Sequence, residues 1–202
     1  LRDKTAVQKV ILFDLDGVLV DVSNSYRLAI KKTAEFFTKQ KITDKEIQAF
    51  KEKGGYNNDW NLTEAVILAR GLRISKEKII KKFQEFYKIF REGETLLLSK
   101  ETLENLSEKY RLGIVTGRPR DEAGYVLKRF NVFKFFDAVI AMEDCGKKQK
   151  PDPFGINLAL KKLEISKTNK MQPMLERNAV YLGDNIDDII AAKNAGIKAI
   201  GI

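Results

Sequence analysis

The second half of the chain alternates between short apolar runs and amphipathic helical patterns, and this alternation limits the folds available to it. Runs typical of strands lie at 112–116, 137–141, 179–183 and 198–202, and helical patterns at 99–110, 120–130, 153–163 and 186–194. Strands that alternate with helices favour right-handed βαβ units around a parallel sheet. An earlier run, Val10–Phe13, has the uniform hydrophobicity of a strand buried on both faces. The sequence therefore predicts an α/β fold with helices on both faces of a parallel sheet.

A different pattern fills the interval between the first strand and this alternating half. It contains four helical segments, which begin near Ser23, Thr43, Asn61 and Ser75. No strand signal interrupts these segments. We therefore expect a discontinuous α/β domain, residues 1–21 and 93–202, and an inserted all-helical cap domain, residues 22–92. Because the insert follows the first strand, the cap is expected above the carboxyl end of that strand.

The composition excludes several kinds of site. The chain has no histidine, so it cannot contain a Ser-His-Asp triad, a Cys-His pair or a His-ligated zinc ion. The single cysteine, Cys145, excludes an intrachain disulfide and fits a reducing cytoplasm, where we expect the protein to lie. No apolar run approaches the ~20 residues needed to cross a bilayer. Carboxylates are therefore the main candidates for a nucleophile or a general acid/base.

The charge balance is basic but does not indicate a nucleic-acid partner. The chain has 37 Lys and Arg against 28 Asp and Glu, a net charge of +9. The lysines are scattered along helical segments with acids between them, and no stripe of aromatic and basic residues appears. We expect a soluble, lysine-rich surface, and the alternative is that its positive field attracts small anions.

Two carboxylates, Asp14 and Asp16, come directly after the first strand. Open α/β sheets keep their ligand sites at the carboxyl ends of their strands. Burying two like charges together is costly unless a cation or a proton compensates for them. The alternative, an Asp-Gly turn without chemistry, is disfavoured because other polar groups follow later strands.

These polar groups come from three later segments of the chain, and we expect them at the same edge of the predicted sheet. Thr116 and Gly117 follow one strand and offer a hydroxyl and backbone N–H groups, and Lys150 precedes a Pro that starts a helix. Three acids follow the 179–183 strand: Asp184, Asp187 and Asp188. Acids, a hydroxyl, an ammonium and backbone donors form a complete set for magnesium-assisted phosphoryl transfer. Taken alone, Thr116 could lie in an ordinary turn, Lys150 could be solvated, and Asp187 could be a helix N-terminal charge.

The order of these motifs resembles that of the haloacid dehalogenase-like hydrolase superfamily. The resemblance rests on Asp-Leu-Asp-Gly at 14–17, Thr-Gly at 116–117, Lys150 before Pro-Asp-Pro, and Gly-Asp-x-x-x-Asp at 183–188. The helical insert resembles that of the subgroup of phosphoglycolate phosphatase and β-phosphoglucomutase. The resemblance implies a Rossmann-like core with an inserted helical cap.

The resemblance also implies catalytic roles. Asp14 would be the nucleophile that forms an aspartyl-phosphate, and Asp16 would protonate the leaving oxygen and then activate water. Lys150 would be the third catalytic residue, because its charge can orient Asp14 and stabilise the transferring phosphoryl group. The implied phosphate-binding groups are Thr116, Gly117 and Lys150. The implied Mg²⁺ ligands are Asp14, the Asp16 backbone carbonyl, Asp184 and Asp188.

Substrate specificity is expected from the insert and from Arg118. The segment 54–60 contains Gly55, Tyr56, Asn57 and Asn58, which suit a substrate-reading loop. The alternative is a helix C-cap followed by an N-cap, with Trp60 anchored in the core. Arg118 could contact phosphate or substrate, or lie on the rim of the site.

The expected function is a Mg²⁺-dependent phosphatase that acts on a small phosphorylated metabolite, as a monomer or homodimer. A phosphomutase would use the same residues, and differs by excluding water. A dehalogenase is disfavoured because similar dehalogenases lack the second acid, Asp16. A non-catalytic protein that binds phosphate or nucleic acid on the same fold is the remaining alternative. The core motifs do not identify the substrate.

Overall fold

A computed structural model describes residues 9–54, 56, 58–164 and 178–202 of the chain. Its internal contacts divide the chain into two compact units. One unit comprises Leu1–Val20 together with Leu96–Ile202, and the other comprises Asp21–Thr95. The first unit is therefore built from two separate stretches of sequence, with the second unit inserted between them.

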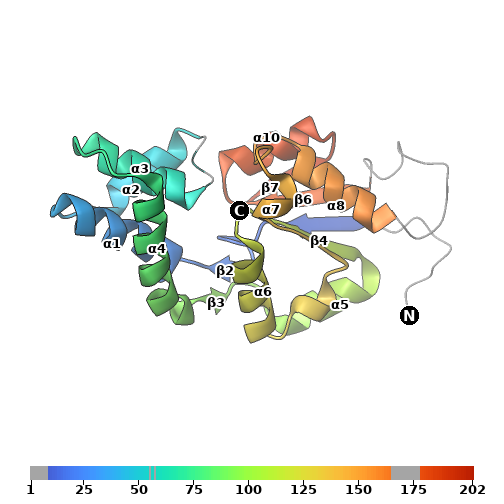
Figure 1. The fold of residues 1–202 in the computed structure, drawn as a ribbon. Helices are drawn as coiled ribbons and strands as arrows, with labels where there is room; N and C mark the ends of the chain where they lie inside the picture. The colour runs from blue at the N-terminus through green and yellow to red at the C-terminus, as the bar shows by residue number, and fades with distance from the viewer. Residues whose placement is uncertain (1–8, 55, 57, 165–177) are drawn as a thin grey trace. The chain divides into compact units, whose positions relative to one another are not determined.

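The first unit is built on a five-stranded sheet with the strand order β5-β4-β1-β6-β7. The strands are β1 (Val10–Phe13), β4 (Arg111–Val115), β5 (Ala138–Ile140), β6 (Ala179–Gly183) and β7 (Lys198–Gly201). All the neighbouring pairs are parallel, which confirms the predicted parallel sheet. β1 lies at the centre, so its carboxyl end lies between those of β4 and β6 (Figure 1).

Helices cover the two faces of this sheet, as predicted. They are α5 (Lys100–Lys109), α6 (Arg120–Arg129), α7 (Met142–Cys145), α8 (Phe154–Glu164) and α10 (Ile186–Asn194), with a 3₁₀ turn at Phe133–Phe135. Figure 1 shows α8 and α10 on one side of the strands and α5 and α6 on the other. The core on the α8 and α10 side includes Leu12 of β1, Ile156 of α8 and Ala191 of α10. On the other face Phe13 meets Phe136 edge to face, with ring centroids 6.1 Å apart.

The second unit consists of four helices around its own core, as the helical patterns predicted. These are α1 (Tyr26–Thr38), α2 (Asp44–Glu52), α3 (Asp59–Ala69) and α4 (Lys76–Phe90), followed by a 3₁₀ turn at Arg91–Gly93. Tyr26 of α1 packs against Phe83 and Tyr87 of α4 in this core. The predicted start of α2 is confirmed, because Thr43 and Glu46 form a reciprocal capping box.

Two short strands that the sequence did not predict lie where the chain passes between the two units, outside the predicted insert of residues 22–92. β2 (Val20–Asp21) and β3 (Thr95–Leu96) form a two-stranded sheet. Two-residue strands leave no periodicity to detect in a sequence, and they form only because distant segments meet. That the helical unit serves as a cap stays a prediction.

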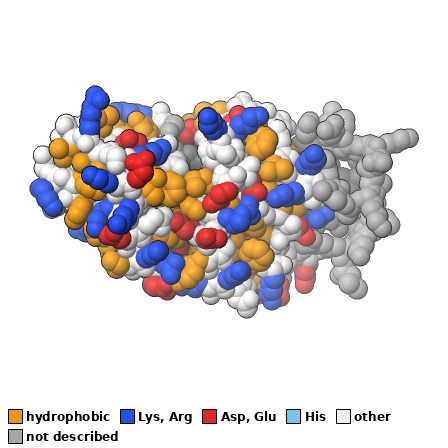
Figure 2. Space-filling view, in the orientation of Figure 1, with side chains coloured by type: hydrophobic (Ala, Val, Ile, Leu, Met, Phe, Trp, Pro, Cys, Tyr) orange, Lys and Arg blue, Asp and Glu red, His pale blue; other side chains and the backbone are white. Residues whose placement is uncertain are grey.

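The exposed charges are distributed as the sequence predicts. On the face shown in Figure 2, Lys and Arg side chains are scattered among acidic ones rather than gathered in a stripe. Among the described residues, no helix is both long and apolar enough to cross a membrane.

Candidate active site

Asp14 lies at the carboxyl end of the central strand, where the backbone fixes its position. Its N–H continues the sheet by donating to the Leu182 carbonyl at 2.8 Å. Its Oδ1 accepts a hydrogen bond from the Leu15 N–H at 2.8 Å. Asp14 is only 5 % exposed, so this carboxylate is held in place and largely shielded from water.

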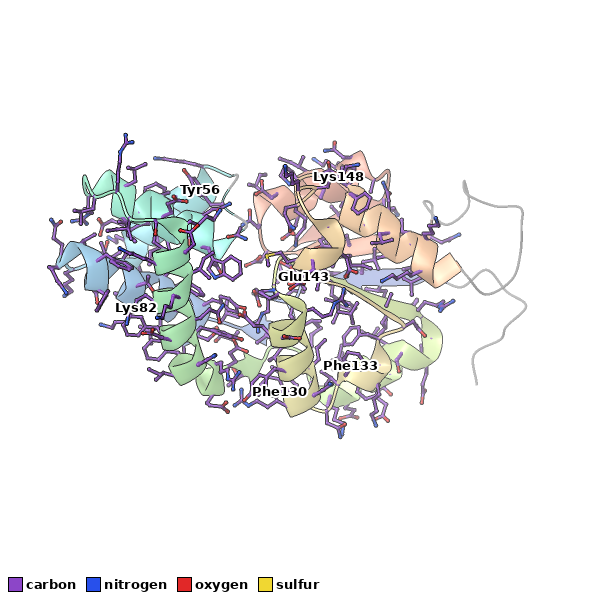
Figure 3. All side chains as sticks on the ribbon, viewed as in Figure 1. Tyr56, Lys82, Phe130, Phe133, Glu143 and Lys148 are labelled. Atoms are coloured by element: carbon purple, nitrogen blue, oxygen red, sulfur yellow. The ribbon has the colours of Figure 1, made fainter. Side chains whose placement is uncertain are left out.

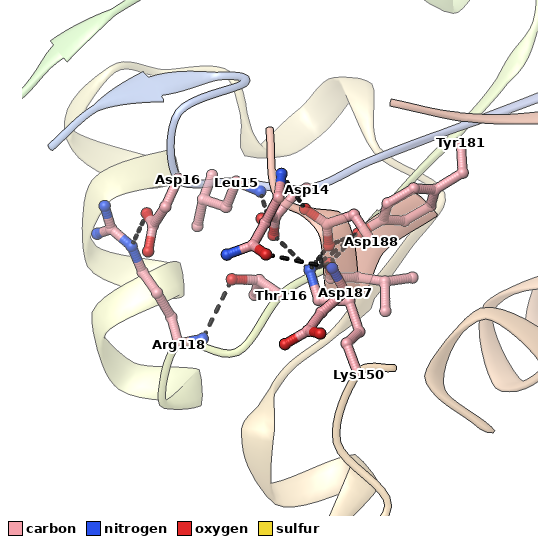
Figure 4. Close-up of polar contacts among 11 residues, drawn as sticks. Asp14, Leu15, Asp16, Thr116, Arg118, Lys150, Tyr181, Asp187 and Asp188 are labelled. Atoms are coloured by element: carbon pink, nitrogen blue, oxygen red, sulfur yellow. Dashed lines mark hydrogen bonds and ion pairs between the residues drawn. The ribbon is translucent and has the colours of Figure 1, made fainter. Parts of the chain in front are cut away.

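Lys150 brings a buried positive charge to Asp14. It lies in the loop between α7 and α8, and its Nζ is 3.0 Å from Asp14 Oδ1 and 2.5 Å from Asp188 Oδ1 (Figure 4). The alternative that Lys150 is an ordinary solvated lysine is therefore wrong, because its side chain is 5 % exposed. The two carboxylates compensate for the cost of removing the Lys150 charge from water.

Tyr181 of β6 completes the surroundings of this ammonium group, and the sequence analysis missed it. Lys150 Nζ donates to the Tyr181 hydroxyl at 3.0 Å, and the hydroxyl donates to the Val115 carbonyl at 2.9 Å. Tyr181 is fully buried. The available signal was a phenol inside an otherwise apolar strand, since a buried tyrosine hydroxyl usually needs a polar partner.

The cluster carries more negative than positive charge. Burial raises the pKa of Asp14 well above its ordinary value, Lys150 opposes this shift, and the charges of Asp188, Asp16 and Asp184 add to it. Burial disfavours the charge on Lys150, but Asp14 and Asp188 raise its pKa well above the ordinary value. One ammonium therefore does not neutralise the neighbouring carboxylates, and a further cation would be stabilised here.

Three carboxylates could hold that cation. Asp14, Asp184 and Asp188 each offer an oxygen, and the three atoms lie within 4.8 Å of one another. Carboxylate oxygens are the ligands that hard divalent cations prefer, so this donor set fits the expected metal. Asp187 lies outside this group, and its N–H donates to Asn185 Oδ1 at 3.1 Å in the N-cap of α10.

Two glycines make room for these carboxylates. Gly17 has a φ of +74°, and a Cβ built there would lie 2.1 Å from Asp184 Oδ2. A Cβ on Gly183 would lie 2.3 Å from the Asp188 Cβ. Close packing therefore requires both glycines, and the positive φ is a second reason for glycine at position 17.

Thr116 and Gly117 follow β4 beside Asp14. Thr116 is 2 % exposed, and its N–H donates to the Ile140 carbonyl at 3.0 Å. Its Oγ1 accepts from the Arg118 N–H at 3.1 Å, which leaves the hydroxyl hydrogen available to donate (Figure 4). Ion pairs thus join Lys150 to Asp14 and Asp188, and Figure 4 shows Thr116 beside this group. Their roles toward a ligand, and that of the Asp16 carbonyl, stay predictions.

Arg118 and Asp16 form a pair that the sequence did not predict. Arg118 Nε is 2.5 Å from Asp16 Oδ1, and the Arg118 side chain is 1 % exposed. Arg118 therefore does not lie on the rim, and its contact with a substrate stays a prediction.

Glu122, in the first turn of α6, is a second group that the sequence did not predict. Burial, together with the charges of Asp16 and Glu143, raises its pKa to about 8.

The 54–60 segment is described only in part. Gly55 and Asn57 lie outside the described residues. Tyr56, which is labelled in Figure 3, packs edge to face on Phe50 with ring centroids 5.6 Å apart. Asn58 accepts hydrogen bonds from the N–H groups of Trp60 and Asn61, so it caps α3 as the alternative interpretation expected. Substrate reading by this segment stays a prediction.

Known proteins resemble the chain over nearly its full length. The chain is 35 % identical over 96 % of its residues to an imidazoleglycerol-phosphate dehydratase of Phytophthora nicotianae, but it spans only 43 % of that protein. It is 29 % identical to the pyrophosphatase PpaX of Bacillus velezensis, with 95 % of the chain and 82 % of the relative covered. It is 26 % identical to a phosphoglycolate phosphatase of Vibrio parahaemolyticus, with 96 % and 83 % covered.

A solved structure gives the same fold. A haloacid dehalogenase-like hydrolase from Bacteroides fragilis superposes with a TM-score of 0.76 at 24 % identity, with 96 % of this chain and 87 % of that chain covered. The family model described as haloacid dehalogenase-like hydrolase matches residues 11–202. That range includes all four motifs whose side chains meet at the carboxyl end of β1. The chain therefore belongs to the haloacid dehalogenase-like hydrolase family.

Proposed function

We propose that this protein is a Mg²⁺-dependent phosphatase that hydrolyses a small phosphomonoester through an aspartyl-phosphate on Asp14. The observation that carries the proposal is the buried Lys150 ammonium, 3.0 Å from Asp14 Oδ1 beside the carboxylate group Asp14, Asp184 and Asp188. A nucleophilic carboxylate, a phosphate-binding ammonium and a cation site are the parts that phosphoryl transfer needs. Relatives named as phosphatases support the same reaction class.

Asp14 acts first in this mechanism. Lys150 Nζ and the Leu15 N–H engage its Oδ1, which orients the carboxylate for attack on phosphorus. A bond forms between an Asp14 oxygen and phosphorus while the bond from phosphorus to the leaving oxygen breaks. Asp16 gives its proton to that oxygen, so the product alcohol departs neutral.

The second step regenerates Asp14. Asp16, now a carboxylate, takes a proton from a water molecule that attacks the phosphorus of the aspartyl-phosphate. The bond between phosphorus and the Asp14 oxygen breaks, and inorganic phosphate forms. The Thr116 hydroxyl, the Gly117 N–H and Lys150 would hold the phosphoryl oxygens in both steps.

Asp14, Asp184, Asp188 and the Asp16 backbone carbonyl would hold the Mg²⁺ ion. When bound, the ion would supply positive charge that screens the Asp14 carboxylate from an anionic phosphoryl group. The carboxylates here outnumber the single ammonium group of Lys150, which supports a divalent rather than a monovalent cation at this site.

The two units would have different roles. Residues 1–21 and 93–202 would form the hydrolase core, and residues 22–92 would form the cap that selects the substrate. Tyr56 and Asn58, with Gly55 and Asn57, are the proposed substrate contacts of the cap. The substrate would be a small phosphorylated metabolite, and the protein would act as a monomer or homodimer.

The first experiment is a panel of phosphorylated metabolites assayed for released phosphate with Mg²⁺ and with EDTA. We include sugar phosphates, phosphoglycolate, nucleotides, pyrophosphate and imidazole-bearing phosphomonoesters, because the relatives act on different compounds by name. Hydrolysis should require Mg²⁺, and Asp14→Asn should abolish it. Asp121→Asn, an exposed acid of α6, is the matched control and should keep full activity.

A phosphomutase would use the same four motifs, so the panel must separate it from a phosphatase. Isomer formation from a sugar phosphate without release of inorganic phosphate would favour the mutase. If the wild-type protein with Mg²⁺ hydrolyses no phosphomonoester and isomerises no sugar phosphate, the enzymatic proposal is wrong. Tight DNA binding in that case would point to the non-catalytic alternative.

A further inference from the structure

We propose that Arg118 is a positioning residue for Asp16, which it holds apart from the metal-binding carboxylates. This inference rests on the proposed function, because it assigns a partner to the general acid/base of that reaction. The contact is direct: Arg118 Nε lies 2.5 Å from Asp16 Oδ1. The arginine side chain is 1 % exposed and the aspartate side chain 26 %, so a fixed cation meets a carboxylate that water can still reach.

The protein fixes Arg118 through its backbone. The residue follows β4 and precedes α6, two elements of the same unit as Asp16. Its N–H donates to Thr116 Oγ1 at 3.1 Å, and its carbonyl accepts from the Met142 N–H at 2.9 Å. The side chain itself is buried, and a planar guanidinium fixes the direction of its partner better than a flexible ammonium does.

The two buried cations, Lys150 and Arg118, contact different acids of the site. Lys150 contacts Asp14 and Asp188, whereas Arg118 contacts Asp16. Figure 4 shows Asp16 turned toward Arg118 and away from the cluster around Lys150. The group that fits a metal ion accordingly contains Asp14, Asp184 and Asp188, without the Asp16 carboxylate.

This division has a consequence for each chemical step. An alkoxide leaving group needs a proton, whereas p-nitrophenolate leaves without one. Hydrolysis of the aspartyl-phosphate needs a base for every substrate. A residue that positions Asp16 should therefore matter for alkyl phosphates in the first step and for all substrates in the second.

The test is Arg118→Met, with Arg120→Met as the matched control. Arg120 also pairs with an acid, Asp144 at 2.6 Å, but its side chain is 53 % exposed. We expect Arg118→Met to lower kcat/KM for an alkyl phosphate about 10- to 100-fold, a part of the usual contribution of general acid catalysis. For p-nitrophenyl phosphate kcat/KM should change less than about threefold, but kcat should fall and a burst of p-nitrophenolate should appear. Arg120→Met should behave as wild type.

Two further measurements separate positioning from other roles. Adding Arg118→Met to Asp16→Asn should cause no further loss, because both changes act through one group. An equal loss of kcat/KM for both substrates, or weaker inhibition by inorganic phosphate, would overturn the inference in favour of direct phosphate binding. If Arg118→Met does not fold, Arg118→Lys carries the same comparison and should show the same pattern, less strongly.

The outcome also separates this inference from the proposed function. If Asp16→Asn itself retains wild-type kinetics with alkyl phosphates, the assignment of Asp16 as general acid/base is wrong. If Asp16→Asn is impaired while Arg118→Met is not, only the role of Arg118 is refuted.

Discussion

Glu122 makes the stability of this protein depend on pH in a direction opposite to that of a typical carboxylate. Burial and the charges of Asp16 and Glu143 raise its pKa from 4.5 to about 8 in the folded protein. Between these two pH values the folded state binds more protons than the unfolded chain, so the free energy of unfolding falls as pH rises. Above about pH 8 the loss is complete.

The magnitude follows from the size of the shift. At about 1.4 kcal/mol per pKa unit, the full shift corresponds to roughly 5 kcal/mol. Glu122→Gln is neutral at every pH, so the stability difference between variant and wild type should grow by about 1–3 kcal/mol from pH 6 to pH 9. Urea unfolding at both pH values measures this difference, and other titrating groups cancel because both proteins share them.

Asp121→Asn is the control, because Asp121 is an exposed acid on the same turn of α6. It should leave the stability difference from wild type the same at pH 6 and pH 9. A Glu122→Gln difference that is equal at the two pH values, or smaller at pH 9, would show that Glu122 is ionised in the folded protein at neutral pH.

Three substitutions test the packing of the site and of the helical unit. Gly17→Ala forces a Cβ against the Asp184 carboxylate at a positive φ, so we expect a loss of about 1–3 kcal/mol in urea unfolding and weaker Mg²⁺ binding by calorimetry. Tyr181→Phe removes the hydroxyl that donates to the buried Val115 carbonyl and should cost about 1–3 kcal/mol; an unchanged urea midpoint would contradict this reading. Thr43→Ala removes the capping box of α2 and should cost about 1 kcal/mol without changing Mg²⁺ affinity.

Most of the fold could be predicted because each element carries its own local signal. The uniformly apolar strands and the amphipathic helices between them required a parallel sheet, and the observed strand bounds differ from the predicted ones by about one residue. The two-residue strands β2 and β3 were missed because pairing between distant segments creates them.

Part of the candidate site could be predicted from the positions of the strand ends. Asp14 and Thr116 follow from one rule, that parallel strands bring their carboxyl ends to one edge. Lys150, in the loop between α7 and α8, and Asp188, in the first turn of α10, were expected there from the order of the motifs. Tyr181 was missed because an aromatic residue in a buried strand normally signals packing, and only the contact with Lys150 reveals its hydroxyl as a partner.

The sequence by itself determined the kind of chemistry available. With no histidine, carboxylates were the main candidates for a nucleophile or a general acid/base, and the order of the motifs placed them at one edge of the sheet. Only the tertiary structure decided which charge meets which: Lys150 lies with Asp14 and Asp188, and Arg118 lies with Asp16. The physical reason is that pairing depends on distances of a few ångströms and on burial, and both arise only when the strands and their loops pack together.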